Sequence, residues 1–197
     1  MSLFVPYDPA DVPALIAAHP LAWVVSNGAA GFAATPLPLL AELDEDGRIA
    51  ALFGHCGRAN PQVAALMADP RATILFQGPQ GYISPRLVSN PTWGPTWNYA
   101  AVRFDVEIAF VPDETRDAVI RLGAALEGTA PDAWSIERMG DRVEGMLTHI
   151  IAFRARVLSQ DARFKLGQDE APGTFDEIIS GLDDQALATA MTRATRG

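Results

Sequence analysis

A run of alternating residues near the middle of the chain constrains the fold more than any other feature. Between Trp97 and Val111, apolar residues at every second position are separated by charged ones. The apolar set is Val102, Phe104, Val106 and Ile108, and the charged set is Arg103, Asp105 and Glu107. A period of two is the spacing at which side chains share one face of a β-strand. The pattern predicts a long strand with one buried face and one face in water.

Further short apolar runs with turn residues between them predict additional strands. They cover residues 21–25, 31–40, 48–55, 72–77, 81–84 and 148–158. Asp44-Glu45-Asp46-Gly47 is a strong hairpin turn, and Gly78-Pro79 is expected to turn the chain between two strands. Strands at such short spacing favour an antiparallel barrel. The expected fold class is α+β, mainly antiparallel β.

Helices are expected around this barrel and in the C-terminal segment. Asn60-Pro61 offers an N-cap followed by proline, and its helix is expected to bury Val63, Leu66 and Met67. Other helices are expected to begin at Asp8-Pro9, Asp113, Pro131, the capping box Thr174-x-x-Glu177 and Asp183. Because no repeat or low-complexity linker interrupts the chain, we expect one domain over residues 1–197. Its barrel core would cover about 20–160 and its helical C-terminal segment about 161–197.

Charge and composition exclude several classes of protein. The chain carries 15 Lys and Arg against 24 Asp and Glu, a formal net charge of −9. It has no basic cluster that matches the roughly 6–10 phosphate contacts of a typical DNA binder. No apolar run approaches the roughly 18 residues that cross a bilayer, and no secretory signal opens the chain. We therefore expect a cytoplasmic protein without direct nucleic-acid or membrane partners, and the one cysteine, Cys56, excludes an internal disulfide.

The stretch from His55 to Pro61 is the strongest candidate for a binding site. A strand is expected to end here, followed by a glycine turn and a helix. Free amides at a helix N-terminus, beside the guanidinium of Arg58, would form an anion site. The alternative is an ordinary turn in which Gly57 supplies backbone freedom, Asn60 caps the helix and Arg58 lies in water. These residues alone leave both interpretations open.

Three later stretches are weaker candidates for a binding site when each is considered alone. Phe76 to Pro85 can be a simple β-turn between strands. Trp97 and Tyr99 flank an amide side chain, so they can stack on a planar ligand or anchor the core beneath a proline-rich loop. Lys165 is the only lysine in a chain with fourteen arginines. Elsewhere, Cys56, His19 and His149 show no catalytic or metal-binding arrangement, so no catalytic residue is assigned and no metal is expected.

Taken together and in this order, these stretches resemble the PaiB-like family of FMN-binding negative transcriptional regulators. The resemblance extends from Phe4-Val5-Pro6 to Lys165-Leu166. Its motifs are His55 with Asn60-Pro61, Phe76-Gln77-Gly78-Pro79 with Tyr82-Ile83-Ser84, and Pro95-Thr96-Trp97-Asn98-Tyr99. It implies an FMN-binding split β-barrel with peripheral helices, similar to pyridoxine-phosphate oxidases and flavin reductases. It also implies a homodimer with the flavin near the subunit interface.

The resemblance implies roles for individual residues as well. Thr35 and the backbone near it would lie along the isoalloxazine ring. The residues implied for the FMN phosphate are Arg58, the amides from Gly57 to Asn60, and His55. Those implied for the ring or ribityl side, some of them from the partner subunit, are Gln77, Ser84, Trp97, Asn98 and Tyr99. Lys165 and Gln168 would close the site from the C-terminal segment.

Two motifs depart from the family pattern. The family usually has Thr-His before Leu-Pro, where this chain has Thr35-Pro36-Leu37-Pro38. It usually has Lys-Leu-Ser-Gln-Asn, where this chain has Lys165-Leu166-Gly167-Gln168-Asp169. The first change removes an imidazole and a backbone donor near the expected ring, and the second removes a hydroxyl and adds a negative charge. We expect the flavin affinity or the substrate side to differ accordingly.

Three functional hypotheses follow. The first is an FMN-dependent redox protein, in which reduced nicotinamide or another donor passes electrons through FMN to an acceptor. The second is a transcriptional regulator that acts through a partner or metabolite, because the charge balance is acidic. The third is a barrel that binds another planar cofactor, such as haem with His55 as an axial ligand, or that has lost its ligand.

Overall fold

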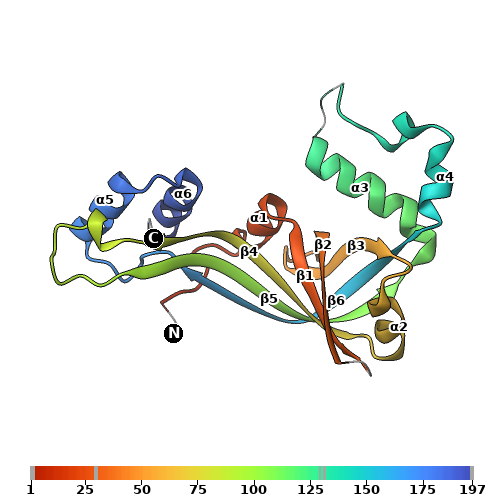
Figure 1. Cartoon of the computed structure of the whole chain (residues 1–197), viewed down its shortest axis with the longest axis horizontal. Coiled ribbons are helices and arrows are strands. Elements are labelled where there is room, and N and C mark those ends of the chain that lie inside the picture. Colours follow the sequence, from red (N-terminus) through yellow and green to blue (C-terminus); the bar gives the residue numbers. More distant parts are fainter. Residues whose placement is uncertain (1–2, 29–30, 129, 131, 196–197) are drawn as a thin grey trace. The chain divides into compact units, whose positions relative to one another are not determined.

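In the computed structural model, which describes residues 3–28, 31–128, 130 and 132–195, six strands close into one barrel (Figure 1). The strands are β1 (Leu21–Gly28), β2 (Gly31–Leu43), β3 (Ile49–Gly57), β4 (Arg71–Ile83), β5 (Thr96–Phe110) and β6 (Ile150–Lys165). Their order around the barrel is β1-β2-β3-β6-β5-β4. The pairs β1–β2, β1–β4, β2–β3 and β3–β6 are antiparallel, which confirms the expected fold class.

The helices lie before, between and after these strands. They are α1 (Asp11–Ala18), α2 (Pro61–Ala68), α3 (Thr115–Glu127), α4 (Arg142–Leu147), α5 (Pro172–Gly181) and α6 (Gln185–Ala194). Short 3-10 helices cover Pro85–Leu87, Pro112–Glu114 and Ile136–Met139. In the described part of the chain, no helix combines the length and apolar character needed to span a bilayer.

Several helix starts differ from those expected. The chain makes a turn at Asp8 before α1 begins at Asp11, and a 3-10 helix that includes Asp113 precedes α3. The prediction of a capping box from Thr174 to Glu177 was wrong. Helix α5 already begins at Pro172, and Glu177 instead accepts two hydrogen bonds from Ser89. Asn60 does cap α2, since its side chain accepts the Gln62 N–H at 2.9 Å. Pro131, expected to begin another helix, lies outside the described residues.

Strand β4 continues through Gly78 and Pro79, where the sequence predicts a turn. Gly78 and Gly81 of this strand instead allow two helices to approach it closely. A Cβ at Gly78 would lie 2.9 Å from Leu15 Cδ1 of α1, and a Cβ at Gly81 would lie 2.8 Å from Leu187 Cδ2 of α6. Glycine inside a strand often marks such a close approach of another element. Strand β6 is also longer than expected, since it ends at Lys165 rather than near residue 158.

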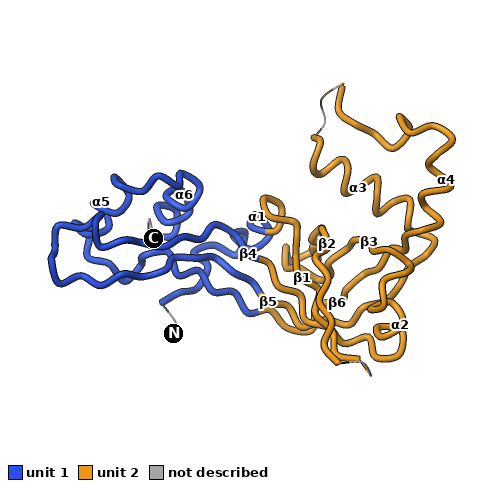
Figure 2. Tube along the Cα trace, viewed as in Figure 1, with its two compact units in different colours: residues 1–15, 77–102, 161–197 blue, residues 16–76, 103–160 orange. Residues whose placement is uncertain are grey.

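The chain divides into two compact units (Figure 2). Unit 2 comprises residues 16–76 and 103–160 and contains β1, β2, β3, α2, α3 and α4. Inside its barrel the ring of Phe76 meets that of Phe104 edge-on, with centroids 6.0 Å apart. On the outer face of β3 and β6, Ala118 of α3 packs against Phe53 and Ala152. The alternation predicted for β5 is confirmed, since Val102, Phe104, Val106 and Ile108 are buried.

Unit 1 comprises residues 1–15, 77–102 and 161–197. It contains residues 77–83 of β4, residues 96–102 of β5 and residues 161–165 of β6, together with α5 and α6. Its core includes Ile178 of α5 and Leu187 and Met191 of α6, all fully buried. The chain around Phe4, which bends and has no regular secondary structure, lies beside β6, where the Phe164 N–H donates to the Phe4 carbonyl at 3.1 Å.

Candidate functional site

The corner between β3 and α2 in unit 2 leaves one arginine free. Arg58 follows the last residue of β3 and is exposed, and its guanidinium has no hydrogen bond or ion pair with another described residue. A Cβ built on Gly57 would meet nothing within 4 Å. The backbone of Gly57 has no positive φ, so the expected need for glycine's conformational freedom was wrong. The Cβ position of Gly57 and the guanidinium of Arg58 are therefore both open to solvent.

Most of the backbone amides at this corner already have partners. The Arg58 N–H donates to the His149 carbonyl at 2.8 Å, and the Asn60 N–H donates to the Gly57 carbonyl at 3.0 Å. The first turn of α2 is capped by Asn60. The expectation of free amides is therefore not met at Arg58 and Asn60. The guanidinium of Arg58 is the main anion-attracting group that the corner presents.

His55 lies three residues before Arg58 and carries an unsatisfied nitrogen. Its Nδ1 is buried and has no hydrogen-bond partner among the described residues. In the ladder between β3 and β6, His55 is opposite Ala152, on the outer face of the barrel. Burial lowers the pKa of His55 below its ordinary value of 6.5, so its imidazole is neutral near pH 7. A buried polar atom without a partner is costly, so a bound group that pairs with Nδ1 would stabilise this corner.

Thr35 is joined to the same corner by hydrogen bonds. Its hydroxyl accepts the Asn60 side-chain N–H at 3.0 Å and donates to Gln62 Oε1. Gln62 is almost fully buried, and its Nε2 lies 2.9 Å from Ser26 Oγ and 3.1 Å from the carbonyls of Val24 and Ala33. This network attaches the start of α2 to the β1–β2 hairpin and fixes the position of Thr35.

Gln62 was missed by the sequence interpretation, which placed Met67 inside the helix face instead. Met67 is 63% exposed, whereas Gln62, Val63 and Leu66 are buried. A signal was available, because Gln62 and Leu66 are four residues apart and therefore lie on one face of a helix.

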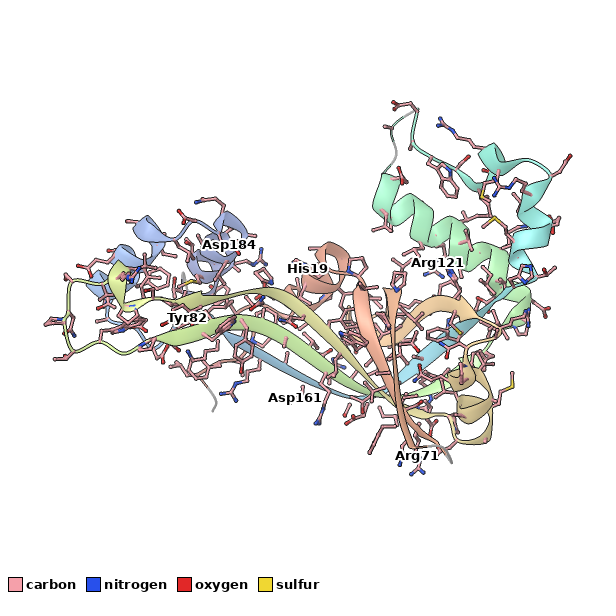
Figure 3. All side chains as sticks on the ribbon, viewed as in Figure 1. His19, Arg71, Tyr82, Arg121, Asp161 and Asp184 are labelled. Carbon is pink, nitrogen blue, oxygen red and sulfur yellow. The ribbon has the colours of Figure 1, made fainter. Side chains whose placement is uncertain are left out.

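In unit 1, an exposed aromatic pair lies on β4 and β5. The rings of Tyr82 and Trp97 have centroids 6.0 Å apart, and each side chain is about half exposed (Figure 3 labels Tyr82). The indole N–H of Trp97 donates to Gln80 Oε1 at 2.6 Å, which fixes the ring. Such a pair offers a planar apolar surface with a defined orientation.

Three other predicted site residues of unit 1 already have internal partners. Lys165 Nζ donates to Thr96 Oγ1 at 2.5 Å and lies 3.4 Å from Asn98 Oδ1. Asn98 is buried, and its Nδ2 lies 3.5 Å from the sulfur of Met191. Gln168 uses its amide within its own turn, with bonds to Leu166 N at 2.7 Å and to the Phe164 carbonyl at 2.6 Å.

The remaining predicted residues are not joined to these by any described hydrogen bond. Ser84 accepts the Arg86 N–H at 3.3 Å at the start of a 3-10 helix. Gln77 is exposed and Tyr99 is partly buried. The structure therefore gathers Thr35 and Asn60 at the corner that carries Arg58, and Trp97, Asn98 and Lys165 in unit 1. Each group is described within its own unit.

Comparison with protein families matches residues 2–159 to the family described as "Putative FMN-binding domain". The chain belongs to this family. A relative in Bacillus subtilis, the protease synthase and sporulation protein PAI 2, is 27% identical over 145 residues. That alignment covers 73% of this chain and 70% of the relative. The PaiB-like resemblance expected from the sequence is confirmed.

Solved structures with the same fold include two further proteins. The FAD and heme binding protein of Mycobacterium smegmatis superposes with a TM-score of 0.61 and 15% identity, over 90% of this chain and 80% of that one. The flavocytochrome Anf3 of Azotobacter vinelandii gives a TM-score of 0.60 and 16% identity, over 81% of this chain and 68% of that one. At these identities the likeness shows the fold. The chain is an FMN-binding protein with a split-barrel fold.

Proposed function

We propose that this FMN-binding protein holds the phosphate of FMN at the corner between Gly57 and Asn60. The observation that carries the proposal is the exposed guanidinium of Arg58, which has no partner among the described residues and follows a glycine whose Cβ position is open to solvent. Guanidinium groups bind phosphate through paired N–H donors. At about 4 Å and an effective dielectric of about 20, the Coulomb attraction is on the order of 4 kcal/mol, of which desolvation and screening leave about 1.5–3 kcal/mol for an exposed charged hydrogen bond. Charges beyond about 8 Å are screened, so the net charge of −9 does not prevent binding.

The neutral imidazole of His55 has a second role in this proposal. Its unpartnered Nδ1 would exchange a hydrogen bond with the bound cofactor, which would remove the cost of leaving that atom unsatisfied. Thr35, held by Asn60 and Gln62, would present its backbone to the flavin ring. Bound FMN would supply hydride and single-electron transfer. The residues at the corner would bind and orient the cofactor, with no acid–base pair required of them.

The residues of unit 1 are proposed to cover the ring and the ribityl chain, in part from a partner subunit. Trp97, Tyr99, Gln77 and Ser84 would contact the cofactor. Asn98, Lys165 and Gln168 already have partners within unit 1, so we assign them to holding this surface in place. Lys165, in particular, bonds the backbone carbonyl of Trp97 at 3.3 Å.

We also propose that the protein is a homodimer. On the outer face of the barrel, Trp23 of β1 is directly opposite Pro36 of β2 on one side and Leu75 of β4 on the other. Trp23, Leu75 and the nearby Leu21 are 52, 41 and 62% exposed. A contiguous apolar face of this kind marks an interaction surface on many proteins. A second copy of the chain is the proposed occupant.

The proposed activity is flavin redox chemistry in the cytoplasm, with reduced nicotinamide as the electron donor. A regulatory role is the second candidate, because the name of the Bacillus relative connects it with protease synthesis and sporulation. Such a role would act through a partner, since the acidic chain would be repelled by DNA at long range. Gel-shift assays across a salt series separate the two: specific binding at physiological salt would favour a direct regulator.

The absorption spectrum of the purified protein tests the proposed function. We expect flavin bands that bleach when reduced nicotinamide is added without oxygen and that return when air is admitted. Flavin bands that do not bleach would contradict the proposed donor. A colourless protein that does not bind added FMN would contradict the cofactor site, and a Soret band would instead support haem bound through His55.

A further inference from the structure

We propose that a hollow in unit 1 binds a small organic cation with an apolar body, such as an ammonium that carries an aryl group. Its volume is about 670 Å³, within the range of about 300–1,000 Å³ that is usual for ligand pockets. Its walls are the N-terminal segment from Leu3 to Tyr7, the turn after β6, the first half of α5 and the end of α6. The inference is independent of flavin binding. Of the residues predicted to contact FMN, only Gln168 reaches the hollow, and its amide is used within its own turn.

The N-terminal segment lines the hollow with unburied apolar side chains. Leu3, Val5 and Tyr7 alternate along it and are 56, 51 and 57% exposed. Phe4 lies between them. Its ring centroid is 5.4 Å from Arg163 Cζ, and its carbonyl accepts the Phe164 N–H. One face of the segment is therefore fixed to β6, and the other presents apolar groups to the hollow. Phe175 and Pro172 of α5 add to this apolar lining.

The charged residues in the described lining of the hollow are acidic. Among the described lining residues, Glu170 and Asp176 are the charged ones, and none is Lys, Arg or His. Glu170 is held in place by the Trp93 indole N–H at 3.0 Å. The carboxylate of Asp176 has no partner among the described side chains, so it is free to pair with a ligand.

Two helix ends of opposite polarity meet the hollow. Helix α6 ends here at Ala194, and the last carbonyls of a helix carry the negative end of its dipole. Helix α5 begins here at Pro172 and brings the positive end of its own dipole, so the two ends oppose each other and the preference for a cation comes from the two carboxylates. An exposed carboxylate alone gives little affinity, so the ligand must also cover the apolar wall. Together these features select a positive head attached to an apolar body.

Calorimetric titration of the full-length protein with 2-phenylethylammonium tests this inference. We expect saturable binding, much weaker binding of ethylammonium, which lacks the aryl body, and none of 3-phenylpropionate, which has the opposite charge. Asp176→Asn is expected to weaken binding by up to about fivefold, because it removes an exposed charged partner. Val5→Ser is expected to weaken it less. Both side chains are exposed or lie at the surface, so both variants should fold.

Asp183→Asn is the matched control, because Asp183 is also an exposed acid of unit 1 but does not line the hollow. It should bind 2-phenylethylammonium as the wild type does. The FMN affinity of Asp176→Asn should equal that of the wild type, which separates this site from the flavin site. Absence of saturable binding, equal binding of 3-phenylpropionate, or equal losses in Asp183→Asn and Asp176→Asn would each overturn the inference.

Discussion

Gly167 lies in the turn after β6, in a backbone conformation that favours glycine. Its φ of +89° lies in the left-handed region that other residues rarely adopt. A Cβ there would lie 3.2 Å from Met191 Cε and 3.3 Å from Phe175 Cε2. The related family pattern has serine at this position, so the departure noted in the sequence matches the tight packing of α5 and α6 around the turn.

Replacing Gly167 with serine should therefore destabilise the protein. We expect the free energy of unfolding to fall by about 1–3 kcal/mol, from backbone strain and crowding together. Urea denaturation measures it. Gly173→Ala in α5 is the control, because a Cβ at Gly173 meets nothing within 4 Å and alanine favours the helix. Equal losses in the two variants would contradict the assignment.

Gln62 is the second residue whose role depends on its surroundings. Its buried amide connects α2 to two carbonyls and a hydroxyl of the β1–β2 hairpin and also holds Thr35. Gln62→Ala should lower the free energy of unfolding by about 2–3 kcal/mol, because it leaves buried acceptors without donors. Thermal and urea unfolding check this. Gln185→Ala, at an exposed position of α6, should change stability little, and a similar effect of both variants would refute the role.

At the scale of elements, a charged clamp attaches α3 to the barrel. The guanidinium groups of Arg121 and Arg154 lie 4.5 and 4.6 Å from the ring centroid of the buried Phe53, and Arg121 lies on the side of α3 that faces the strands (Figure 3). Glu42 of β2 bonds both, at 2.8 Å to Arg121 and 2.5 Å to Arg154. Glu114, just before α3, bonds Arg154 at 2.8 Å. Helix α3 is therefore held by cations that cover an aromatic ring.

The clamp predicts how stability depends on pH. Burial raises the pKa of Glu42, but hydrogen bonds from Arg154 and Arg121 outweigh it and hold the pKa below its ordinary value of 4.5. Its stabilising contribution is therefore complete above about pH 5 and is lost as the pH falls through the lowered pKa. Glu42→Gln should reduce stability by about 1–2 kcal/mol at neutral pH.

The difference between Glu42→Gln and wild type should shrink as the solution is acidified below about pH 4. Urea titrations over a pH series measure it, with Glu45→Gln in the exposed hairpin turn as the control. A difference that does not change with pH, or one that is equally large for Glu45→Gln, would argue against the clamp.

A structural feature could be predicted from the sequence where the residues that determine it are neighbours in the chain. The alternation in β5 and the Asn60 cap depend on neighbouring residues, and both were predicted correctly. The reason for glycine at position 78 inside β4 could not be predicted locally, because the side chain that approaches it closely is Leu15 of α1, far away in sequence. Glu177 was assigned to a capping box from its spacing to Thr174, and its actual partner, Ser89, could not be predicted because it is also distant in the chain.

At the scale of the whole molecule, the sequence correctly predicted the barrel and the family, whereas the roles of the site residues stay predictions. The corner at Arg58 was identified because strand, glycine and capped helix are contiguous in the chain. The internal partners of Asn98 and Lys165 could not be predicted, since they come from Met191 and Thr96 on other elements. The family motifs thus supplied the candidate residues, and the hydrogen bonds show which of these candidates already have internal partners.

The proposed homodimer can be tested through its apolar outer face. Trp23→Arg would place a charge in the middle of the proposed interface, where burial without a partner is costly. We expect sedimentation to show a dimer for wild type and a monomer for Trp23→Arg. Leu126→Arg, at an exposed position of α3, should remain dimeric. A monomeric wild type, or a Trp23→Arg variant that stays dimeric, would rule out this interface.

The dissociation constant of FMN for Arg58→Ala tests the central claim most directly. We expect the variant to bind FMN about 10- to 100-fold more weakly than wild type, the loss of a charged hydrogen bond of about 1.5–3 kcal/mol, with unchanged folding stability. Arg48→Ala, at the opposite end of β3 and paired with Asp46, should bind FMN as the wild type does. An unchanged FMN affinity in Arg58→Ala would contradict the phosphate site at this corner.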